Sequence, residues 1–506
     1  MTLLLIIISL ITFSLTANFF PKYNKLFICV SILLVISFYF YLSKNFFYIE
    51  NFFPSTKPCY YHPCGNYYNF LVNSLKKHKL YIAEDDEHLL STDPTLYKTY
   101  DISYTNYKNI PSLFDTSYYN EKIYLYFGIT PVLLFYLPFN LVTNLYLTDK
   151  LLIFILSCFI FLLSLFLVNK LSKGFVTSHN IPPNIIILSI FFIGICNKVP
   201  FILVRSTIYE SAITTAVFLL LLSLCLFYFY IVTEHKKKKN ILIFLIALSL
   251  CLSVGARPYY VLFIPIFFLS VLWIEYKETK CIYDMIKATI IFLIPCFIYG
   301  TIVALYNYLR FDSIFEFGWT YQLNPLNQYE YVANLKDLIT GLTNNIFHLP
   351  DMNERTIFSL SKTSGHSLGE DDIVGIIWTY PIVFILIFIP IFLKNFYKKS
   401  TNYFLFTLIL ISIIIISIII TSFIGMINRY SLEYLSIIII LSTLIFFFCL
   451  NKIDDKTTRN FLNILFILLF VYSIFINISL LFCKGNAAFY ASSSGNNYIK
   501  IIKLLF

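Results

Sequence analysis

Residues 115–139 read DTSYYNEKIYLYFGITPVLLFYLPF, and the interpretation of the whole chain depends on this stretch. It begins as a tyrosine-rich polar segment with a carboxylate at Asp115, and it becomes a short apolar run that Pro131 and Pro138 interrupt. Proline inside a helix removes a backbone hydrogen bond and bends the helix. We therefore predict that residues 129–147 form a re-entrant or juxtamembrane helix at the outer face, and do not cross the membrane.

The composition is that of a polytopic membrane protein. Hydrophobic residues make up 58% of the chain and charged residues only 13%, whereas about a quarter of a soluble domain is charged. The net charge of +10 comes from lysines that cluster between apolar runs. Such clusters report membrane topology and not a nucleic-acid-binding surface. The expected partner of this composition is therefore the lipid bilayer, with no nucleic acid.

Twelve apolar runs are long enough to cross a membrane, for which about 17–25 residues are needed. The first lacks the basic segment and cleavage site of a signal peptide, so we expect a retained helix. The predicted spans are residues 3–20, 25–43, 151–169, 184–203, 208–232, 240–255, 260–275, 286–307, 375–394, 402–426, 432–450 and 459–483.

Four consecutive lysines at 236–239 set the orientation, because cytoplasmic loops are enriched in lysine. Counting outwards, the clusters at 170/173, 277/280/287, 394/398/399 and 452/456/459 fall on the same side. A membrane-crossing 129–147 helix would place the polar 44–128 segment in the cytoplasm or invert that pattern. The chain is thus predicted to be one transmembrane domain over residues 1–483. Two large external loops, 44–150 and 308–374, and an external tail, 484–506, complete it.

Asp115 is the first candidate for chemistry. It precedes the predicted outer-face helix, where a carboxylate could meet both a lipid-borne donor and an aqueous acceptor. There it would act as a general base, or it would hold a divalent cation such as Mg²⁺ or Mn²⁺ that neutralises a phosphate leaving group. The structural alternative is a turn or helix cap. No Cys/His spacing identifies a metal site, so metal dependence stays open.

Arginine is rare, with six residues against 31 lysines, and five of the six are external in the predicted topology. Four of them end apolar spans, and their planar forks suit bidentate binding of phosphate if the helix ends converge. Glu210 is a costly charge near the membrane that needs a partner, and Lys198 could pair with it or contact phosphate. The alternative is that the arginines are snorkelling anchors beside interfacial tyrosines. The four are Arg205, Arg257, Arg310 and Arg429.

As a set, six stretches resemble a bacterial branch of the GT-C glycosyltransferase superfamily, related to the protein mannosyltransferase and aminoarabinose transferase types. They occur in the expected order from about residue 60 to 445. The resemblance implies an acidic catalytic residue in the first large external loop, and a lipid phosphate held by Arg205, Arg257 and Arg429. The stretches are DPTLYKTYDISY, DTSYYNEKIYLYFGITPVLLFYLPFNLVT, RSTIYESAITTAVFLLLLSLCLFY, LSVGARPYYVLFIPI, YNYLRFDSIFEFGWTYQLNP and NRYSLEYLSIIIIL.

The chain departs from the superfamily pattern in two places. Many members carry an acidic pair early in the first loop, whereas the corresponding GNYYNFLVNSLKKHKLYI has Asn66 and no carboxylate. Either Asp115 takes the acidic role, with Asp93 and Asp101 in reserve, or the chemistry differs or is absent. The helix at 3–20 is additional.

The sequence therefore predicts an all-α integral membrane protein of the bacterial cytoplasmic (inner) membrane, GT-C-like, with about 12 transmembrane helices and two large extracytoplasmic loops. It would transfer a sugar from a polyprenyl-phosphate donor to a cell-envelope glycan, lipid or protein. A transporter or flippase of lipid-linked glycans would use the same arginines but would need polar residues continuing through the helices. A non-catalytic membrane scaffold is the third reading.

Overall fold

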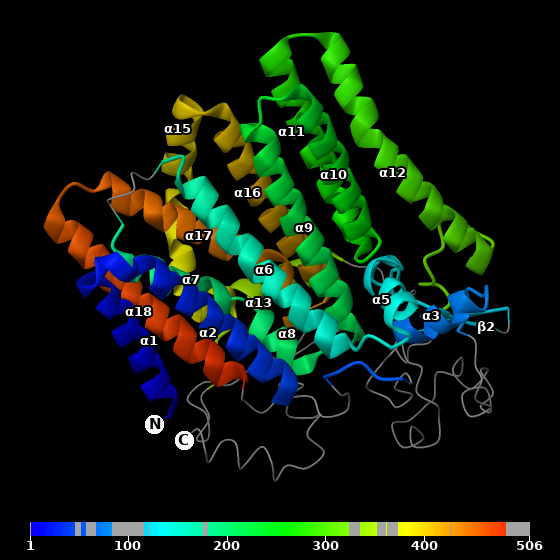
Figure 1. The fold of residues 1–506 in the computed structure, drawn as a ribbon, viewed down its shortest axis with the longest axis horizontal. Helices are drawn as coiled ribbons and strands as arrows, with labels where there is room; N and C mark the ends of the chain where they lie inside the picture. The colour runs from blue at the N-terminus through cyan, green and yellow to red at the C-terminus, as the bar shows by residue number, and fades with distance from the viewer. Residues whose placement is uncertain are drawn as a thin grey trace.

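The computed structural model is a bundle of long helices with a short two-stranded hairpin at one end (Figure 1). The all-α membrane architecture expected from the sequence is confirmed. The structure describes residues 2–45, 52–56, 67–82, 116–120, 122–175, 181–322, 334–351, 361, 373–425 and 427–481.

The helices of the described chain follow the twelve predicted spans. Nine are long and apolar enough to cross a membrane, and Val132–Thr143 and Pro381–Tyr397 are shorter apolar helices. The bounds are α1 (Thr2–Phe19), η1 (Pro21–Tyr23), α2 (Asn24–Asn45), α6 (Asp149–Ser172), α7 (Pro183–Ile195), α8 (Val199–Arg205), α9 (Ile208–Val232), α10 (Lys236–Val254), η5 (Pro258–Phe263), α11 (Ile264–Thr279), α12 (Ile282–Phe311), η7 (Pro381–Phe388), α15 (Ile389–Lys399), α16 (Thr401–Ile424), η8 (Asn428–Ser431), α17 (Leu432–Lys452) and α18 (Lys456–Leu481).

Two spans form the centre of the bundle. The apolar windows of Pro183–Arg205 and Asn428–Lys452 are 94% buried, whereas only 22% of the window in Ile282–Phe311 is buried. A helix that is hydrophobic on all sides is expected to be buried among other helices. The interior spans begin or end at Arg205 and Arg429, so these arginines lie where the central helices emerge.

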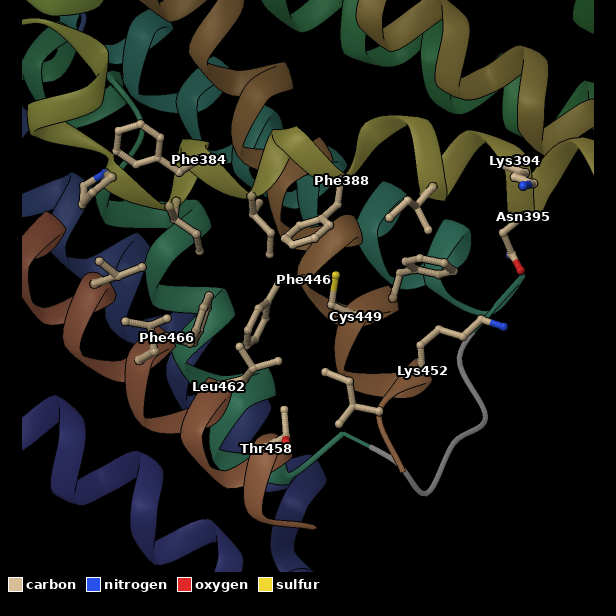
Figure 2. A pocket seen from close by; sticks show the side chains of 18 residues that line it. Phe384, Phe388, Lys394, Asn395, Phe446, Cys449, Lys452, Thr458, Leu462 and Phe466 are labelled. Carbon is tan, nitrogen blue, oxygen red and sulfur yellow. The ribbon is translucent and has the colours of Figure 1, made fainter. Parts of the chain in front are cut away.

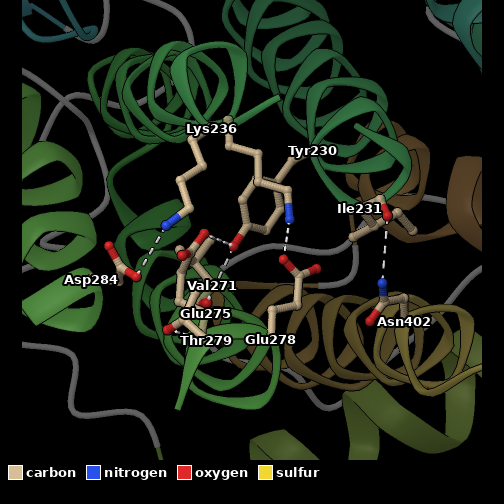
Figure 3. Close-up of polar contacts among 10 residues, drawn as sticks. Tyr230, Ile231, Lys236, Val271, Glu275, Glu278, Thr279, Asp284 and Asn402 are labelled. Atoms are coloured by element: carbon tan, nitrogen blue, oxygen red, sulfur yellow. Dashed lines mark hydrogen bonds and ion pairs between the residues drawn. The ribbon is translucent and has the colours of Figure 1, made fainter. Parts of the chain in front are cut away.

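The lysine-bearing connections meet at one end of the bundle, which we call the lysine end. Lys239 at the start of α10 pairs with Glu278 at the end of α11, and Lys236 reaches Asp284 of α12 at 3.5 Å (Figure 3). The Asn402 amide of α16 donates to the Ile231 carbonyl of α9 at 3.4 Å. These contacts join several helices on the side that the lysines predict to be cytoplasmic.

The opposite end, which we call the arginine end, carries the segments predicted to be external (Figure 1). A second apolar cluster there is separate from the bundle core and includes Tyr68, Leu125 and Val132. The short elements at this end are α3 (Tyr67–Lys76), β1 (Thr116–Tyr119), β2 (Lys122–Leu125), η4 (Val132–Tyr136), α5 (Leu137–Thr143), α13 (Leu335–Phe347) and α14 (Ile376–Thr379).

The predicted helix at 129–147 is observed as η4 followed by α5. Pro131 precedes η4, and the Leu137 N–H donates to the Val132 carbonyl five residues back, a π-helical spacing. Pro138 follows and has no N–H to donate. The helix stops at Asn144, whose left-handed φ of 57° ends α5. Its depth in a membrane remains a prediction. The antiparallel β1–β2 hairpin was not predicted.

Candidate phosphate-binding site

The first ion pair of the site forms across the break between α8 and α9. Ser206 takes a left-handed φ of 39°, which ends α8 directly after Arg205. Glu210 then sits in the first turn of α9, where it accepts a hydrogen bond from the Thr207 N–H at 3.1 Å. The Arg205 Nε lies 3.1 Å from the Glu210 Oε1. The Glu210 side chain is fully buried, so its charge is balanced by the neighbouring guanidinium.

The second ion pair joins α10 to α17. Arg257 follows the end of α10, and its Nε donates to the Glu433 Oε1 at 3.0 Å. The Tyr259 hydroxyl donates to the other oxygen of Glu433 at 2.7 Å. The Glu433 side chain is fully buried, and that of Arg257 is 18% exposed. The Arg257 Nη2 is buried and has no hydrogen-bond partner in the described chain. This nitrogen of the guanidinium can therefore donate a hydrogen bond to a ligand.

Arg429 connects the two pairs through aromatic rings. Its guanidinium carbon lies 4.6 Å from the centre of the Tyr209 ring, next to Glu210 in the sequence. The Tyr430 ring lies 4.6 Å from the Arg257 guanidinium and 5.4 Å from that of Arg429. Cation–π contacts of this kind hold a guanidinium in place. Arg257 and Arg429 thus share the Tyr430 ring, and Arg205 is linked to Arg429 through the neighbouring residues Tyr209 and Glu210.

Lys198 lies in the same region. Its ammonium donates to the Asn428 side-chain oxygen at 2.9 Å, directly before Arg429. The residue is 7% exposed. Glu210 itself pairs with Arg205, and contact of Lys198 with a phosphate remains a prediction. We call Lys198, Arg205, Glu210, Arg257, Arg429 and Glu433 the arginine cluster.

The first external segment reaches the arginine cluster. The Phe127 ring packs edge-on against Tyr209, with centroids 5.2 Å apart. The Thr130 N–H donates to the Gly255 carbonyl at 3.2 Å, two residues before Arg257. A Cβ on Gly128 would lie 1.9 Å from the Gly255 oxygen, so only glycine allows this approach. The GITP stretch is therefore fixed beside the second ion pair.

The two external loops meet at β1, the strand that follows Asp115. The Tyr118 N–H donates to the Tyr321 carbonyl at 2.8 Å, and the Ser117 hydroxyl donates to the Gly318 carbonyl at 2.9 Å. Further along, the rings of Tyr126 and Trp319 are 6.3 Å apart. The TYQ segment of the second loop thus covers the strand next to the proposed base.

Buried tyrosines extend the site towards α3 and α6. Tyr136 and Ser211 both donate to the Asp149 Oδ1, the latter at 2.8 Å. Burial raises the pKa of Tyr68 well above its usual value, and the nearby Asp149 raises it further, so the Tyr68 phenol stays protonated. The hydroxyls of Tyr68, Tyr260 and Tyr306 are buried without a hydrogen-bond partner in the part of the chain described. Buried polar groups normally have partners, and a polar ligand at this end would supply them.

Arg310 is the exception among the four predicted arginines. Its guanidinium donates to the Leu125 carbonyl at 2.7 Å and to the Asn307 side chain at 2.8 Å. It also stacks on Tyr306 at 3.8 Å. These contacts tie α12 to the end of β2, which is a structural role.

The predicted catalytic carboxylates Asp115, Asp93 and Asp101 lie outside the described residues. Within the described ranges, no three His, Cys, Asp or Glu side chains come together as a metal site would require. The proposed Mg²⁺ or Mn²⁺ therefore remains a prediction tied to the undescribed carboxylates.

Sequence reasoning missed Glu433 and Asp149. Both are carboxylates in spans that are otherwise apolar, and such residues are rare unless they serve a function or a partner. Glu433 lies four residues after Arg429, one helical turn away in the sequence. That spacing was the available signal.

No protein-family model and no curated protein matches this chain. Its fold is similar to two structures of the oligosaccharyltransferase of Archaeoglobus fulgidus, one in the apo form and one with an inhibitory peptide and a dolichol-phosphate. The TM-scores are 0.46 and 0.45, at 11% and 13% identity, over 94% and 96% of this chain. The alignments span 60% of the length of those chains. This likeness assigns no superfamily to the chain and no role to any of its residues.

Proposed function

We propose that this protein is a membrane glycosyltransferase that takes a sugar from a polyprenyl-phosphate donor at the outer face of the cytoplasmic membrane. The acceptor would be a hydroxyl of a cell-envelope glycan, lipid or protein. The single observation that carries the proposal is the convergence of Arg205, Arg257 and Arg429 at the ends of three different spans.

The arginine cluster suits a phosphate that is attached to a lipid. It lies where apolar spans end, so a polyprenyl tail can remain in the bilayer while the phosphate meets the guanidiniums. The Arg257 Nη2 offers a buried donor towards such an oxygen. Glu210 and Glu433 hold Arg205 and Arg257 by direct contacts, so we assign them as positioning residues.

The electrostatic requirement of the reaction matches these cations. When the bond between the sugar C1 and the phosphate oxygen breaks, the lipid phosphate leaves with one additional negative charge. Preorganised donors around that developing charge are among the largest contributions to enzymatic rate. The cations would therefore stabilise the transition state more than the bound donor.

The acceptor side of the reaction is assigned to the first external loop. The acceptor oxygen forms the new bond to C1, and its proton passes to a carboxylate, for which Asp115 remains the candidate, with Asp93 and Asp101 in reserve. Asp115 immediately precedes β1, which is fixed by Gly318 and Tyr321. A bound Mg²⁺ or Mn²⁺ would instead help to neutralise the phosphate.

The test is transfer of radiolabelled sugar from a panel of synthetic polyprenyl-phosphate sugars by purified protein with envelope extract. Asp115→Asn and Arg429→Ala are assayed in parallel, and Arg459→Ala at the lysine end is the matched control. We expect transfer that the first two substitutions abolish and the third leaves intact. No transfer from any donor, with Arg429-dependent binding of the lipid phosphate, would favour a flippase. Full transfer by both Asp115→Asn and Arg429→Ala would refute the assigned roles.

A further inference from the structure

A large apolar cavity lies on the side of the bundle formed by η7, α15, α17 and α18. Its volume is about 870 Å³, near the upper limit of about 1,000 Å³ for small-molecule sites. Figure 2 shows Phe384, Phe388, Phe446 and Phe466 along it. Such a lining excludes a sugar or a nucleotide and favours hydrocarbon chains.

One end of the cavity is polar. Lys394, Asn395 and Lys452 gather there, at the lysine end of the bundle (Figure 2). Both lysines are exposed and neither belongs to an ion pair in the described chain. The Asn395 side-chain nitrogen is buried and has no hydrogen-bond partner among the residues described. The three side chains therefore present nitrogen donors at the mouth of a hydrocarbon-lined cavity.

The carboxylates nearest in sequence do not line the polar end of the cavity, where Lys394 and Lys452 lie. Asp454 and Asp455 follow Lys452 in the chain but do not line the cavity. Asp455 accepts a hydrogen bond from the Thr458 N–H at 2.7 Å and so caps α18. The Arg459 guanidinium donates to the Ile453 carbonyl. The local charge thus suits an anion beside Lys394 and Lys452.

The cavity is long enough to hold an acyl chain lengthwise. Along α18 the lining runs from Thr458 to Leu469, which is roughly 16 Å at about 1.5 Å per residue. Along η7 and α15 it runs from Pro381 to Asn395, which is roughly 24 Å at about 2.0 Å per residue in η7 and about 1.5 Å in α15. The hydrocarbon core of a bilayer is about 30 Å thick. An acyl chain whose headgroup lies at the lysine end can therefore extend along the cavity.

We infer that this cavity binds an anionic glycerophospholipid, with its acyl chains along the phenylalanines and its phosphate at Lys394, Asn395 and Lys452. The juxtaposition of a long apolar cavity with three nitrogen donors at its mouth carries the inference. The site is distinct from the arginine cluster and does not depend on the proposed transferase activity.

The test is native mass spectrometry of the purified full-length protein released from nanodiscs that contain equal amounts of phosphatidylglycerol and phosphatidylcholine. We expect one retained phosphatidylglycerol. Lys394→Ala with Lys452→Ala should weaken its retention about tenfold or more. Each lysine near an anionic headgroup contributes about 1 kcal/mol of binding free energy, and the double variant loses two lysines. Lys237→Ala with Lys238→Ala removes two exposed lysines from the same end outside the cavity, and should leave retention unchanged.

Two further observations guard the result. All four lysines are exposed, and equal melting temperatures would show that the variants are folded. A bulky substitution in the lining, Cys449→Trp, should also displace the lipid while both lysines remain. Equal retention of phosphatidylcholine and phosphatidylglycerol would overturn the inference. So would equal retention of phosphatidylglycerol by both lysine double variants, or a dimer of the chain without bound lipid in the mass spectrum.

Discussion

The two ends of the bundle use charge in different ways. At the lysine end, Lys236 is 79% exposed while it pairs with Asp284, and the Lys239 side chain, itself 9% exposed, pairs with a Glu278 that is 38% exposed. At the arginine end, Glu210 and Glu433 are fully buried and each contacts an arginine. Exposed pairs contribute little to stability, whereas buried charges are costly and are tolerated only with a close partner. The lysine end therefore fits an orienting and joining role, and the arginine end a binding role.

The largest expected effect comes from breaking a buried pair. Glu433→Gln leaves the Arg257 guanidinium without its carboxylate, and we expect the free energy of unfolding to fall by about 3–5 kcal/mol. The contrasting change at the other end, Asp284→Asn, leaves the 79% exposed Lys236 without its partner and should cost less than about 1 kcal/mol. Denaturant titration of both variants in detergent micelles measures the difference. Equal losses would remove the distinction between the two ends.

The next effect concerns the rate of transfer. Arg429→Ala should lower the rate about 10²-fold or more, because a preorganised cation beside the leaving phosphate is lost. Arg429→Lys should not restore the full rate, since a lysine cannot reproduce a planar fork stacked on Tyr209. Initial rates with a saturating donor check both variants. A lysine variant as fast as the original protein would mean that Arg429 contributes only charge.

Close backbone contact gives a smaller expected effect. Gly128→Ala would place a Cβ 1.9 Å from the Gly255 oxygen, and such overpacking costs about 1–3 kcal/mol. Gly300 on α12 has nothing within 4 Å of a Cβ, so Gly300→Ala should be neutral or stabilising by up to about 1 kcal/mol. Thermal unfolding of both variants checks the pair. Gly128→Ala should in addition slow transfer, because the GITP stretch moves away from Arg257.

The smallest effect is expected for Lys236→Ala. The pair with Asp284 is long, at 3.5 Å, and its lysine is exposed, so the free energy of unfolding should change by less than about 0.5 kcal/mol. Added salt should reduce even this difference. A loss above 2 kcal/mol would show that the lysine end also depends on its ion pairs for stability.

Much of the fold could be predicted because membrane-spanning helices are recognisable as long apolar runs in the sequence. Uninterrupted apolar runs placed the twelve helices, and the prolines at 131 and 138 identified the short helix before α6. The β1–β2 hairpin was missed because TSYY and KIYL are four residues each, too short for a clear alternating pattern.

The candidate site could be predicted only in part. Arginines at span ends pointed to a common location, and contacts link three of the four. Their binding of a phosphate stays a prediction. Which partners they take could not be predicted, because the contact between Arg257 and Glu433 joins residues 176 positions apart. The partner of Arg310 could not be predicted for the same reason, since Leu125 belongs to a strand of the first loop.

The central claim is that the arginine end binds a lipid phosphate, and a neutral exchange tests it most directly. Arg257→Met with Glu433→Leu removes both charges but leaves an apolar contact, which is often as stable as a buried pair. Binding of polyprenyl phosphate to this variant in nanodiscs is compared with that of Lys239→Met with Glu278→Leu. We predict that the arginine-end variant remains folded and binds about tenfold to hundredfold more weakly, while the lysine-end variant binds normally. Equal binding by both variants would contradict the account.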